Sequence, residues 1–193
     1  MSKKIILASN SPQRKTLLHQ AGIKFVVQPS RVEELHKITG SCSALVKHNA
    51  ILKAQDVASR LRKGIVIGAD TLVYGGHRQI VGKPRNLKEA KEILRELTSR
   101  SHWVYTGVAV IDVESGHQVV DYERTKVFMH KLSDEEIDRY HCMMSPLDKA
   151  GGFDIEGRGG LFIHRIEGCY SNVIGLPLPK LRMMLKELGV KAL

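Results

Sequence analysis

The sequence feature that most constrains the fold is residues 65–73, Ile-Val-Ile-Gly-Ala-Asp-Thr-Leu-Val, the most strand-like run in the chain. Its near-continuous apolarity predicts a strand buried on both faces, as in the centre of a sheet flanked by helices. Asp70 interrupts this pattern, because an unpaired buried carboxylate is too costly to keep. We therefore expect Asp70 to be paired, bound to a metal ion or kept protonated, and a structural pair and a catalytic role remain equally open.

The N-terminal stretch predicts a strand, a short polar bend and a helix. Ser11 has the position of a helix N-cap, and Pro12 the first helical position. Free N–H groups at a helix start, the hydroxyls of Ser9 and Ser11, and the cations Arg14 and Lys15 one turn later would form a cradle for an anion such as phosphate. Neither the P-loop pattern nor the G-x-G-x-x-G pattern of dinucleotide-binding proteins occurs here.

Helical and strand patterns alternate along the chain, which predicts an α/β protein with a mixed twisted sheet and flanking helices. We expect a single domain over residues 1–193, with a cleft between two lobes, one holding the N-terminal unit and Asp70. Capping boxes are expected at Asn86 and Ser133, and Tyr74 to Arg78 is expected to form a hairpin turn. The predicted strands are residues 25–27, 65–73, 103–112, 118–129, 161–166 and 170–174, and a long helix is predicted over residues 43–61.

The composition limits the partners. The chain has 193 residues, a formal net charge of +10 and three cysteines without a C-x-x-C spacing. The charge favours an anionic partner, while the ten aromatic residues and the dispersed basic residues make nucleic acid the weaker choice. We expect a soluble cytoplasmic protein with no membrane segment, and the sequence leaves open whether it forms a homodimer.

Several cations stand near expected functional elements. Lys47, His48 and Lys53 flank the apolar stripe of the long helix, and a solvated flank is the favoured interpretation unless an acidic group faces them. Lys83 lies between Gly82 and Pro84, which would aim its side chain reproducibly. The glycine-rich residues 145–168 would let the main chain approach a ligand closely.

A family resemblance rests on motifs that span nearly the whole chain. The motifs are Ser9-Asn10-Ser11-Pro12-Gln13-Arg14, Gly68-Ala69-Asp70-Thr71, Gly82-Lys83-Pro84, Asp148-Lys149-Ala150-Gly151 and Tyr170-Ser171-Asn172-Val173-Ile174-Gly175-Leu176-Pro177. With them the sequence resembles the Maf family of nucleoside triphosphate pyrophosphatases, which have an inosine triphosphate pyrophosphatase-like fold. The resemblance implies hydrolysis between the α- and β-phosphates, with a divalent cation, Mg²⁺ or Mn²⁺, and a house-cleaning role; restraint of septum formation is also associated with the family.

The resemblance implies a role for several residues. Asp70 matches the aspartate that accepts a proton from water, with Glu34, Lys53 and Lys83 around the triphosphate. Asp70 and Glu34 are also the candidate ligands for the metal ion, since Mg²⁺ prefers oxygen and keeps several waters. Whether Asp70 acts as the base or as a ligand stays open. The substrate-binding candidates are Ser9, Ser11, Arg14 and Lys149.

The resemblance implies that base specificity depends on Gln13, Thr71 and Glu156. The dTTP/UTP type of the family has arginine, threonine and glutamine at these positions, and the 7-methyl-GTP type has tryptophan, glutamine and glutamate. This chain fits neither set. A carboxylate at Glu156 would prefer the adjacent donors of guanine, whereas Thr71 resembles the pyrimidine type, so specificity stays open between the two. A basic nucleic-acid-binding protein and a non-catalytic nucleotide sensor remain as alternatives to the enzyme.

Overall fold

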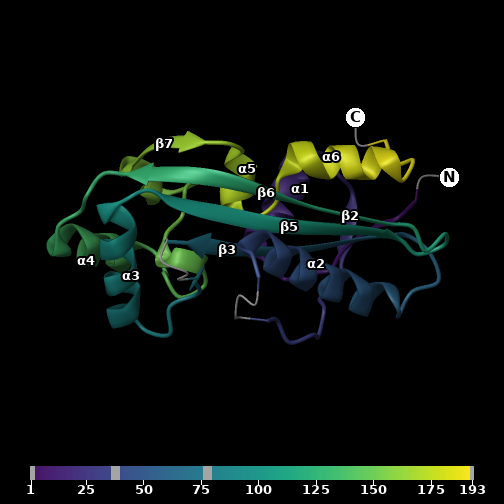
Figure 1. Ribbon diagram of the computed structural model, residues 1–193, viewed down its shortest axis with the longest axis horizontal. Coiled ribbons are helices and arrows are strands. Elements are labelled where there is room, and N and C mark those ends of the chain that lie inside the picture. Colours follow the sequence, from purple (N-terminus) through teal and green to yellow (C-terminus); the bar gives the residue numbers. More distant parts are fainter. Residues whose placement is uncertain (1–2, 36–39, 76–79, 192–193) are drawn as a thin grey trace. The chain divides into compact units, whose positions relative to one another are not determined.

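A computed structural model describes residues 3–35, 40–75 and 80–191. These residues form a mixed seven-stranded sheet of order β2-β1-β3-β5-β6-β7, with β4 paired to β3, and flanking helices (Figure 1). The predicted α/β class is therefore confirmed. None of the helices in the described ranges is long and apolar enough to cross a membrane. The strands are β1 (Ile5–Leu7), β2 (Phe25–Val27), β3 (Ile65–Tyr74), β4 (Ile80–Val81), β5 (His102–Asp112), β6 (Gln118–Met129) and β7 (Ile163–Glu167).

The α-helices are α1 (Pro12–Gln20), α2 (Cys42–Ala58), α3 (Leu87–Ser99), α4 (Asp134–Met143), α5 (Tyr170–Ile174) and α6 (Leu178–Glu187). Two short 3₁₀ turns, η1 (Ala150–Gly152) and η2 (Arg158–Leu161), lie in the glycine-rich region. Strand β1 pairs in parallel with β2 and β3, while β3 with β4 and β6 with β7 are antiparallel. Strands β5 and β6, which correspond to the predicted strands over residues 103–112 and 118–129, are neighbours in the sheet.

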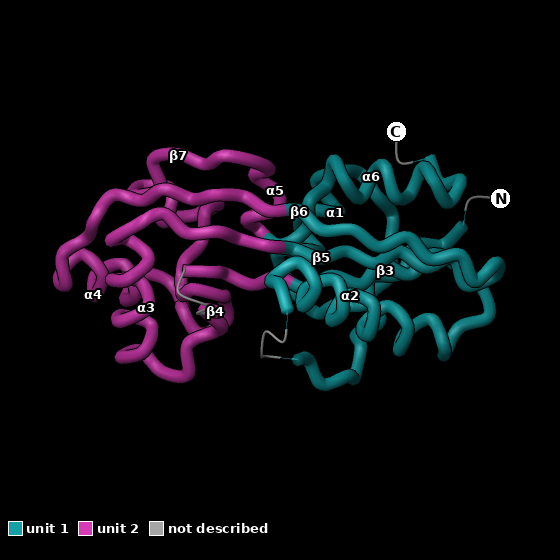
Figure 2. The backbone as a smooth tube through the Cα atoms, viewed as in Figure 1, with its two compact units in different colours: residues 1–70, 106–123, 175–193 teal, residues 71–105, 124–174 magenta. Residues whose placement is uncertain are grey.

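The chain divides into two compact units (Figure 2). Unit 1 comprises residues 1–70, 106–123 and 175–193, and unit 2 comprises residues 71–105 and 124–174. Strands β3, β5 and β6 therefore contribute residues to both units. The active-site cleft expected between two lobes stays a prediction.

In unit 1, helix α2 packs directly against the strands. A Cβ atom added to Gly68 on β3 would overlap the carbonyl oxygen of Ala50, and one added to Gly107 on β5 would overlap that of Val46. Only glycine permits so close an approach of helix and sheet backbones. The apolar stripe of α2 is buried there with residues of β1, β3 and β5, namely Ile6, Ala8, Ala50, Ala54, Val57, Val66, Ala109 and Ile111. The polar residues on the same helix face are thereby held close to β3.

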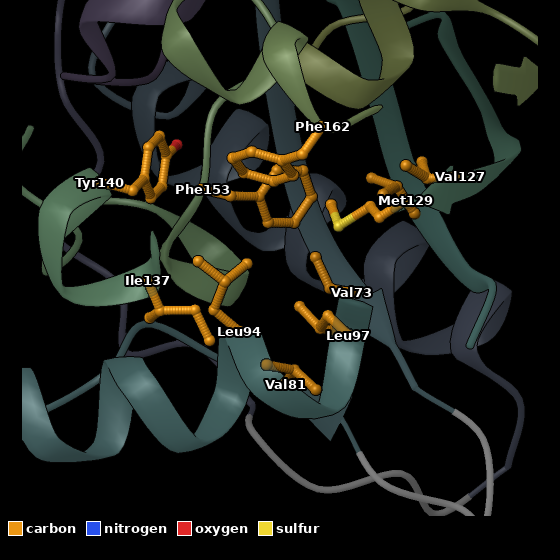
Figure 3. Close-up of a cluster of buried hydrophobic side chains, with 11 residues drawn as sticks. Val73, Val81, Leu94, Leu97, Val127, Met129, Ile137, Tyr140, Phe153 and Phe162 are labelled. Carbon is orange, nitrogen blue, oxygen red and sulfur yellow. The ribbon is translucent and has the colours of Figure 1, made fainter. Parts of the chain in front are cut away.

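Unit 2 has a separate core, which is rich in aromatic residues (Figure 3). Helix α3 contributes Leu94 and Leu97, which lie three residues apart on one face and are buried. The cluster consists of Val73, Val81, Leu94, Leu97, Val104, Val127, Met129, Ile137, Tyr140, Phe153 and Phe162. Burial of this apolar surface stabilises unit 2.

The C-terminal segment corrects one prediction. Residues 170–174 were expected to form a strand but form helix α5. The fully buried side chain of Asn172 donates hydrogen bonds to the carbonyl oxygen of Val104 at 3.1 Å and to Thr125 Oγ1 at 2.9 Å. These bonds fix a helical turn on β5 and β6, whereas a sequence pattern of only five residues does not distinguish a strand from a short helix.

The two capping boxes differ in outcome. Ser133 and Glu136 form the predicted box at the start of α4. At α3 the Asn86 side chain accepts from the Glu89 backbone N–H at 2.9 Å. The Glu89 carboxylate instead accepts from the backbone and side chain of Arg85, so the reciprocal half of that prediction is wrong. Of the expected hairpin turn, residues 76–78 lie outside the described residues.

Candidate active site

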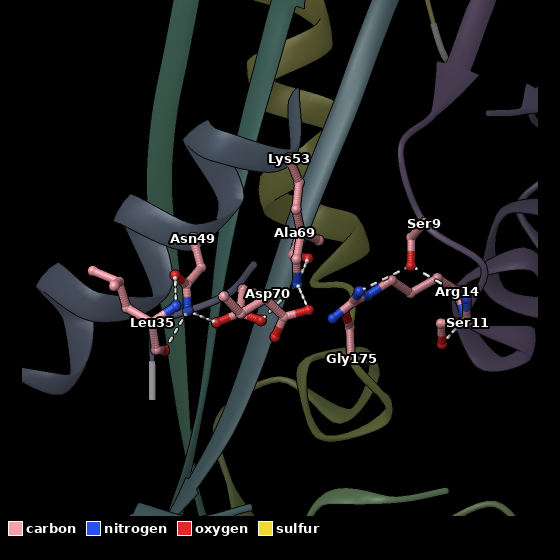
Figure 4. A network of polar contacts seen from close by, with 10 residues as sticks. Ser9, Ser11, Arg14, Leu35, Asn49, Lys53, Ala69, Asp70 and Gly175 are labelled. Carbon is pink, nitrogen blue, oxygen red and sulfur yellow. Dashed lines mark hydrogen bonds and ion pairs between the residues drawn. The ribbon is translucent and has the colours of Figure 1, made fainter. Parts of the chain in front are cut away.

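The bend after β1 holds Arg14 in a buried position. Ser11 is the N-cap of α1, with its Oγ accepting from the Arg14 N–H at 3.4 Å, and Pro12 is the first helical residue, as predicted. Ser9 Oγ accepts from the Ser11 N–H at 3.2 Å and from Arg14 Nη1 at 3.1 Å, and Arg14 Nε donates to the Gly175 carbonyl oxygen at 2.9 Å. The guanidinium is therefore fixed from two directions (Figure 4).

The charge of Arg14 faces acidic groups of the same unit. Burial lowers the pKa of the guanidinium, and the negative charges of Asp70 and Glu34 oppose that shift. Gln13, expected to bear on base choice, accepts a hydrogen bond from Ser11 Oγ at 2.9 Å through its Oε1. Its side chain thus also orders the bend that precedes Arg14.

Asp70 lies in β3 and is only 6% exposed. Its Oδ1 accepts from Lys53 Nζ at 2.8 Å, and its Oδ2 accepts from Asn49 Nδ2 at 2.9 Å. Lys53 also donates to the Ala69 carbonyl oxygen at 3.3 Å. Both donors come from α2, where residues four apart lie on one face, and Figure 4 shows them reaching the carboxylate together. The anomaly seen in the sequence is resolved by an ion pair.

Glu34 joins this cluster from the loop after β2. Lys53 Nζ lies 2.8 Å from Glu34 Oε1, so one ammonium group contacts both predicted acidic residues. The Glu34 side chain is 42% exposed, in contrast to that of Asp70 at 9%. The interpretation of Lys53 as a solvated residue is therefore wrong, because an acidic group does face it. His48, which flanks the same helix, is exposed.

The carboxylates of Glu34 and Asp70 fit a hard divalent cation in their chemistry. Both reach one cationic group, the Lys53 ammonium, and both offer the oxygen atoms that Mg²⁺ prefers. No cluster of three or more His, Cys, Asp or Glu suited to a metal ion occurs in the described ranges. Such a cation would therefore depend on water and on substrate oxygens for its remaining ligands.

The other predicted site residues belong to unit 2. Thr71 follows Asp70 in β3, and Lys83 and Glu156 are exposed. Lys149 Nζ lies 2.7 Å from Asp148 Oδ1. Their approach to the Asp70 cluster stays a prediction.

Two participants were missed by sequence reasoning. Asn49 lies within the apolar stripe of α2, one turn before Lys53, and a buried polar residue at that spacing is a signal that could have found it. Gly175 lies in the last of the family motifs, but that motif does not show that its carbonyl group holds Arg14, because any residue carries a carbonyl group.

The comparison with protein families settles membership. A family model described as Maf-like protein matches residues 4–188. The chain belongs to the Maf family. It is 46% identical over 194 residues to a dTTP/UTP pyrophosphatase of Dictyoglomus thermophilum, with 100% of both chains covered. It is 45% identical over 186 residues to the dTTP/UTP pyrophosphatase of Alkaliphilus metalliredigens, with 96% of each covered.

A solved structure shares the fold of this Maf chain. The Ham1 protein of Staphylococcus aureus matches with a TM-score of 0.55 and 19% identity, covering 96% of this chain and 100% of the other. At this identity the likeness concerns the fold alone. It agrees with the inosine triphosphate pyrophosphatase-like fold that the motifs implied.

Proposed function

We propose that this Maf protein is a nucleoside triphosphate pyrophosphatase that converts dTTP or UTP to the monophosphate and pyrophosphate. The observation that carries the proposal is the cluster of Lys53, Asp70 and Glu34 in the unit that also holds Arg14. The full-length relatives named dTTP/UTP pyrophosphatases support the reaction and the pyrimidine base.

The cations of the site suit a polyphosphate. Pyrophosphate departure concentrates negative charge on the phosphate oxygens, and fixed cations stabilise that charge without reorganising. Arg14 is fixed by Ser9 and Gly175, and Lys53 by Asp70 and Glu34. Lys83 and Lys149 would add positive charge from unit 2, and Ser11 a hydroxyl group.

A divalent cation, Mg²⁺ or Mn²⁺, is part of the proposal. Asp70 and Glu34 would hold it, together with phosphate oxygens of the substrate. When bound, it would neutralise charge on the triphosphate and lower the pKa of a coordinated water molecule.

The products require cleavage of the α–β anhydride. In the proposed step the oxygen of water bonds to the α-phosphorus, the bond from that phosphorus to the α–β bridging oxygen breaks, and pyrophosphate leaves with the electron pair. Asp70 is the group that would accept the proton from water, because each of its oxygens has one protein donor and keeps a further acceptor position. Asn49 and Lys53 would hold the carboxylate in place during that transfer.

The choice of base would involve Thr71, Gln13 and Glu156. Uracil and thymine present an N3–H donor between two carbonyl acceptors, to which a side chain that both donates and accepts can bind. Glu156 is exposed as a whole, but partial loss of solvent around its carboxyl group raises the pKa of Glu156, and the negative charge of Asp154 adds to the effect. The acid form, which this shift favours as the pH falls, both donates and accepts as glutamine does, so we expect acid to favour a pyrimidine at this position.

A substrate panel tests the proposal. The purified chain is assayed with dTTP, UTP, CTP, GTP and 7-methyl-GTP, with Mg²⁺, with Mn²⁺ and with EDTA, and products are separated by ion-exchange chromatography. We expect dTMP or UMP and pyrophosphate in equal amounts, and loss of turnover in EDTA. Release of the nucleoside diphosphate and orthophosphate, or binding without hydrolysis of any of these nucleotides, would contradict the proposal.

A further inference from the structure

The buried amide of Asn49 contacts two parts of unit 1. Its Nδ2 donates to Asp70 Oδ2 at 2.9 Å and to the Leu35 carbonyl oxygen at 3.0 Å, and its Oδ1 accepts from the Leu35 N–H at 3.0 Å. The side chain is 2% exposed. Because the Leu35 N–H can only donate and its carbonyl can only accept, these partners also fix the orientation of the amide.

The side chain of Leu35 adds little to this anchor. It is 50% exposed, so apolar burial does little to hold the loop at this point. Glu34, which precedes it, contacts Lys53 through an ion pair with a half-exposed carboxylate, and such pairs contribute little by themselves. Among the residues that the structure describes, the two backbone bonds to Asn49 are therefore the main restraint on Leu35.

We propose that Asn49 is a positioning residue that clamps the Glu34–Leu35 segment to Asp70, so that both carboxylates stay at Lys53. The inference rests on the proposed pyrophosphatase function and deepens it. A side chain at this position must donate two hydrogen bonds and accept one at the same time. Asparagine does so, whereas aspartate offers no N–H donor and alanine offers neither donor nor acceptor.

The clamp acts on Glu34 and Asp70, and it does not act on the residues that hold Arg14. Arg14 is held by Ser9 and Gly175, whereas Asn49 bonds to Leu35 and Asp70. Loss of the amide should therefore reduce kcat and weaken the response to Mg²⁺, while KM for the nucleotide changes little. Changes to residues that orient catalytic or metal-binding groups reduce activity by roughly 10- to 100-fold.

The test compares Asn49→Ala and Asn49→Asp with wild type. Steady-state kinetics with UTP over a range of Mg²⁺ concentrations give kcat and KM, and hydrogen–deuterium exchange of the Leu35 amide gives a readout independent of activity. We expect Asn49→Ala to lower kcat about 10- to 100-fold with KM within about two-fold, and the Leu35 amide to exchange faster. Asn49→Asp keeps an acceptor for the Leu35 N–H and nearly the same volume, so we expect slower exchange than in Asn49→Ala but an equal or greater loss of kcat.

Asn172→Ala is the matched control. Asn172 is a fully buried asparagine whose amide also donates two hydrogen bonds, to Val104 and Thr125 in unit 2. Its loss should lower thermal stability while the exchange of the Leu35 amide stays as in wild type.

The outcomes separate the clamp from the function. Unchanged kcat in both Asn49 variants, or Leu35 exchange that matches wild type in Asn49→Ala, overturns the clamp. If wild type hydrolyses no nucleotide of the panel, the proposed function fails, and the catalytic role of Asn49 fails with it. The exchange data still decide whether Asn49 holds the loop as described.

Discussion

The two units bury polar groups of different kinds. Among the described residues, the buried arginine, lysine and aspartate side chains, Arg14, Lys53, Asp70 and Asp112, all lie in unit 1. The buried polar residues of unit 2 are the uncharged Thr98, Thr125, Ser171 and Asn172, together with His102, whose pKa is lowered by burial to about 4. Buried charges are rarely the most stabilising choice. Their confinement to one unit therefore indicates where chemistry takes place, and the neutral groups of unit 2 mainly join strands and helices.

Asp70→Asn tests this comparison with the largest expected effect. The amide keeps the size of the side chain but cannot accept a proton, and general base catalysis contributes roughly 10²- to 10⁴-fold. We expect kcat/KM for UTP to fall by a factor in that range, measured by pyrophosphate release.

Asp112→Asn is the matched control for Asp70→Asn. Asp112 is also a buried aspartate of unit 1, and its Oδ2 accepts from Lys3 Nζ at 2.6 Å and from Ser115 Oγ at 2.8 Å. Its replacement should reduce stability and leave kcat near wild type. Equal activity of the two variants would remove the distinction between catalytic and structural charges.

Lys53→Met is expected to have the next largest effect. The variant leaves Asp70 buried without its cation, and breaking a buried pair in this way costs about 3 kcal/mol. For a chain of this size, that corresponds to a fall in Tm of roughly 6–12 °C. If Glu34 and Asp70 hold the metal ion, Mg²⁺ should restore part of the lost Tm of the variant. The rise in Tm on adding Mg²⁺ should be larger for the variant than for wild type.

Lys91→Met is the control from unit 2. Lys91 Nζ lies 2.6 Å from Asp138 Oδ2, but the pair lies at the surface. We expect a smaller change in Tm and no added response to Mg²⁺, measured by differential scanning calorimetry. A Mg²⁺ response equal in both variants would argue against metal binding at Glu34 and Asp70.

Acid should place a charge among the buried polar groups of unit 2 by protonating His102. Burial lowers its pKa to about 4, while the backbone carbonyls of Leu97 and Arg100 oppose that shift. The unfolded chain, with a histidine pKa near 6.5, then binds more protons between about pH 6.5 and 4. The stabilising effect of the neutral ring is complete above pH 6.5 and is lost as the pH falls through this window, by about 3 kcal/mol in total.

His102→Gln removes that titration. The free energy of unfolding from urea titrations at several pH values should show a shallower slope for the variant between pH 4 and 6.5, whatever its absolute stability. Identical slopes would show that His102 is not the group that charges.

The smallest expected effect concerns Glu156. Because burial and Asp154 raise its pKa, the protonated form gains population as the pH falls, and the preference for UTP over GTP should rise with it. In Glu156→Gln that preference should stay constant across pH. In wild type the preference should change with pH by only a few-fold, because the residue is exposed. The ratio of kcat/KM for the two nucleotides measures this. An unchanged pH dependence in the variant would assign base choice to other residues.

The sequence by itself determined the class of fold and the most important residue. Near-continuous apolarity over residues 65–73 requires burial on both faces, and Asp70 within it requires a partner, since these demands are local properties of the chain. The Ser11 cap with Pro12, and the Ser133 capping box, were likewise predictable from residues a few positions apart.

Only the tertiary structure decided which groups meet. From the sequence Lys53 is interpreted as a solvated lysine, but in the structure it contacts Asp70 of β3. Asn49 is a polar residue in an apolar stripe, and only the structure shows that its amide bonds to Leu35 and Asp70. Residues 170–174 read as a strand because their helical conformation depends on Asn172 bonding to β5 and β6. Each of these contacts joins residues 14 or more positions apart, and the pattern of neighbouring residues does not encode such long-range pairings.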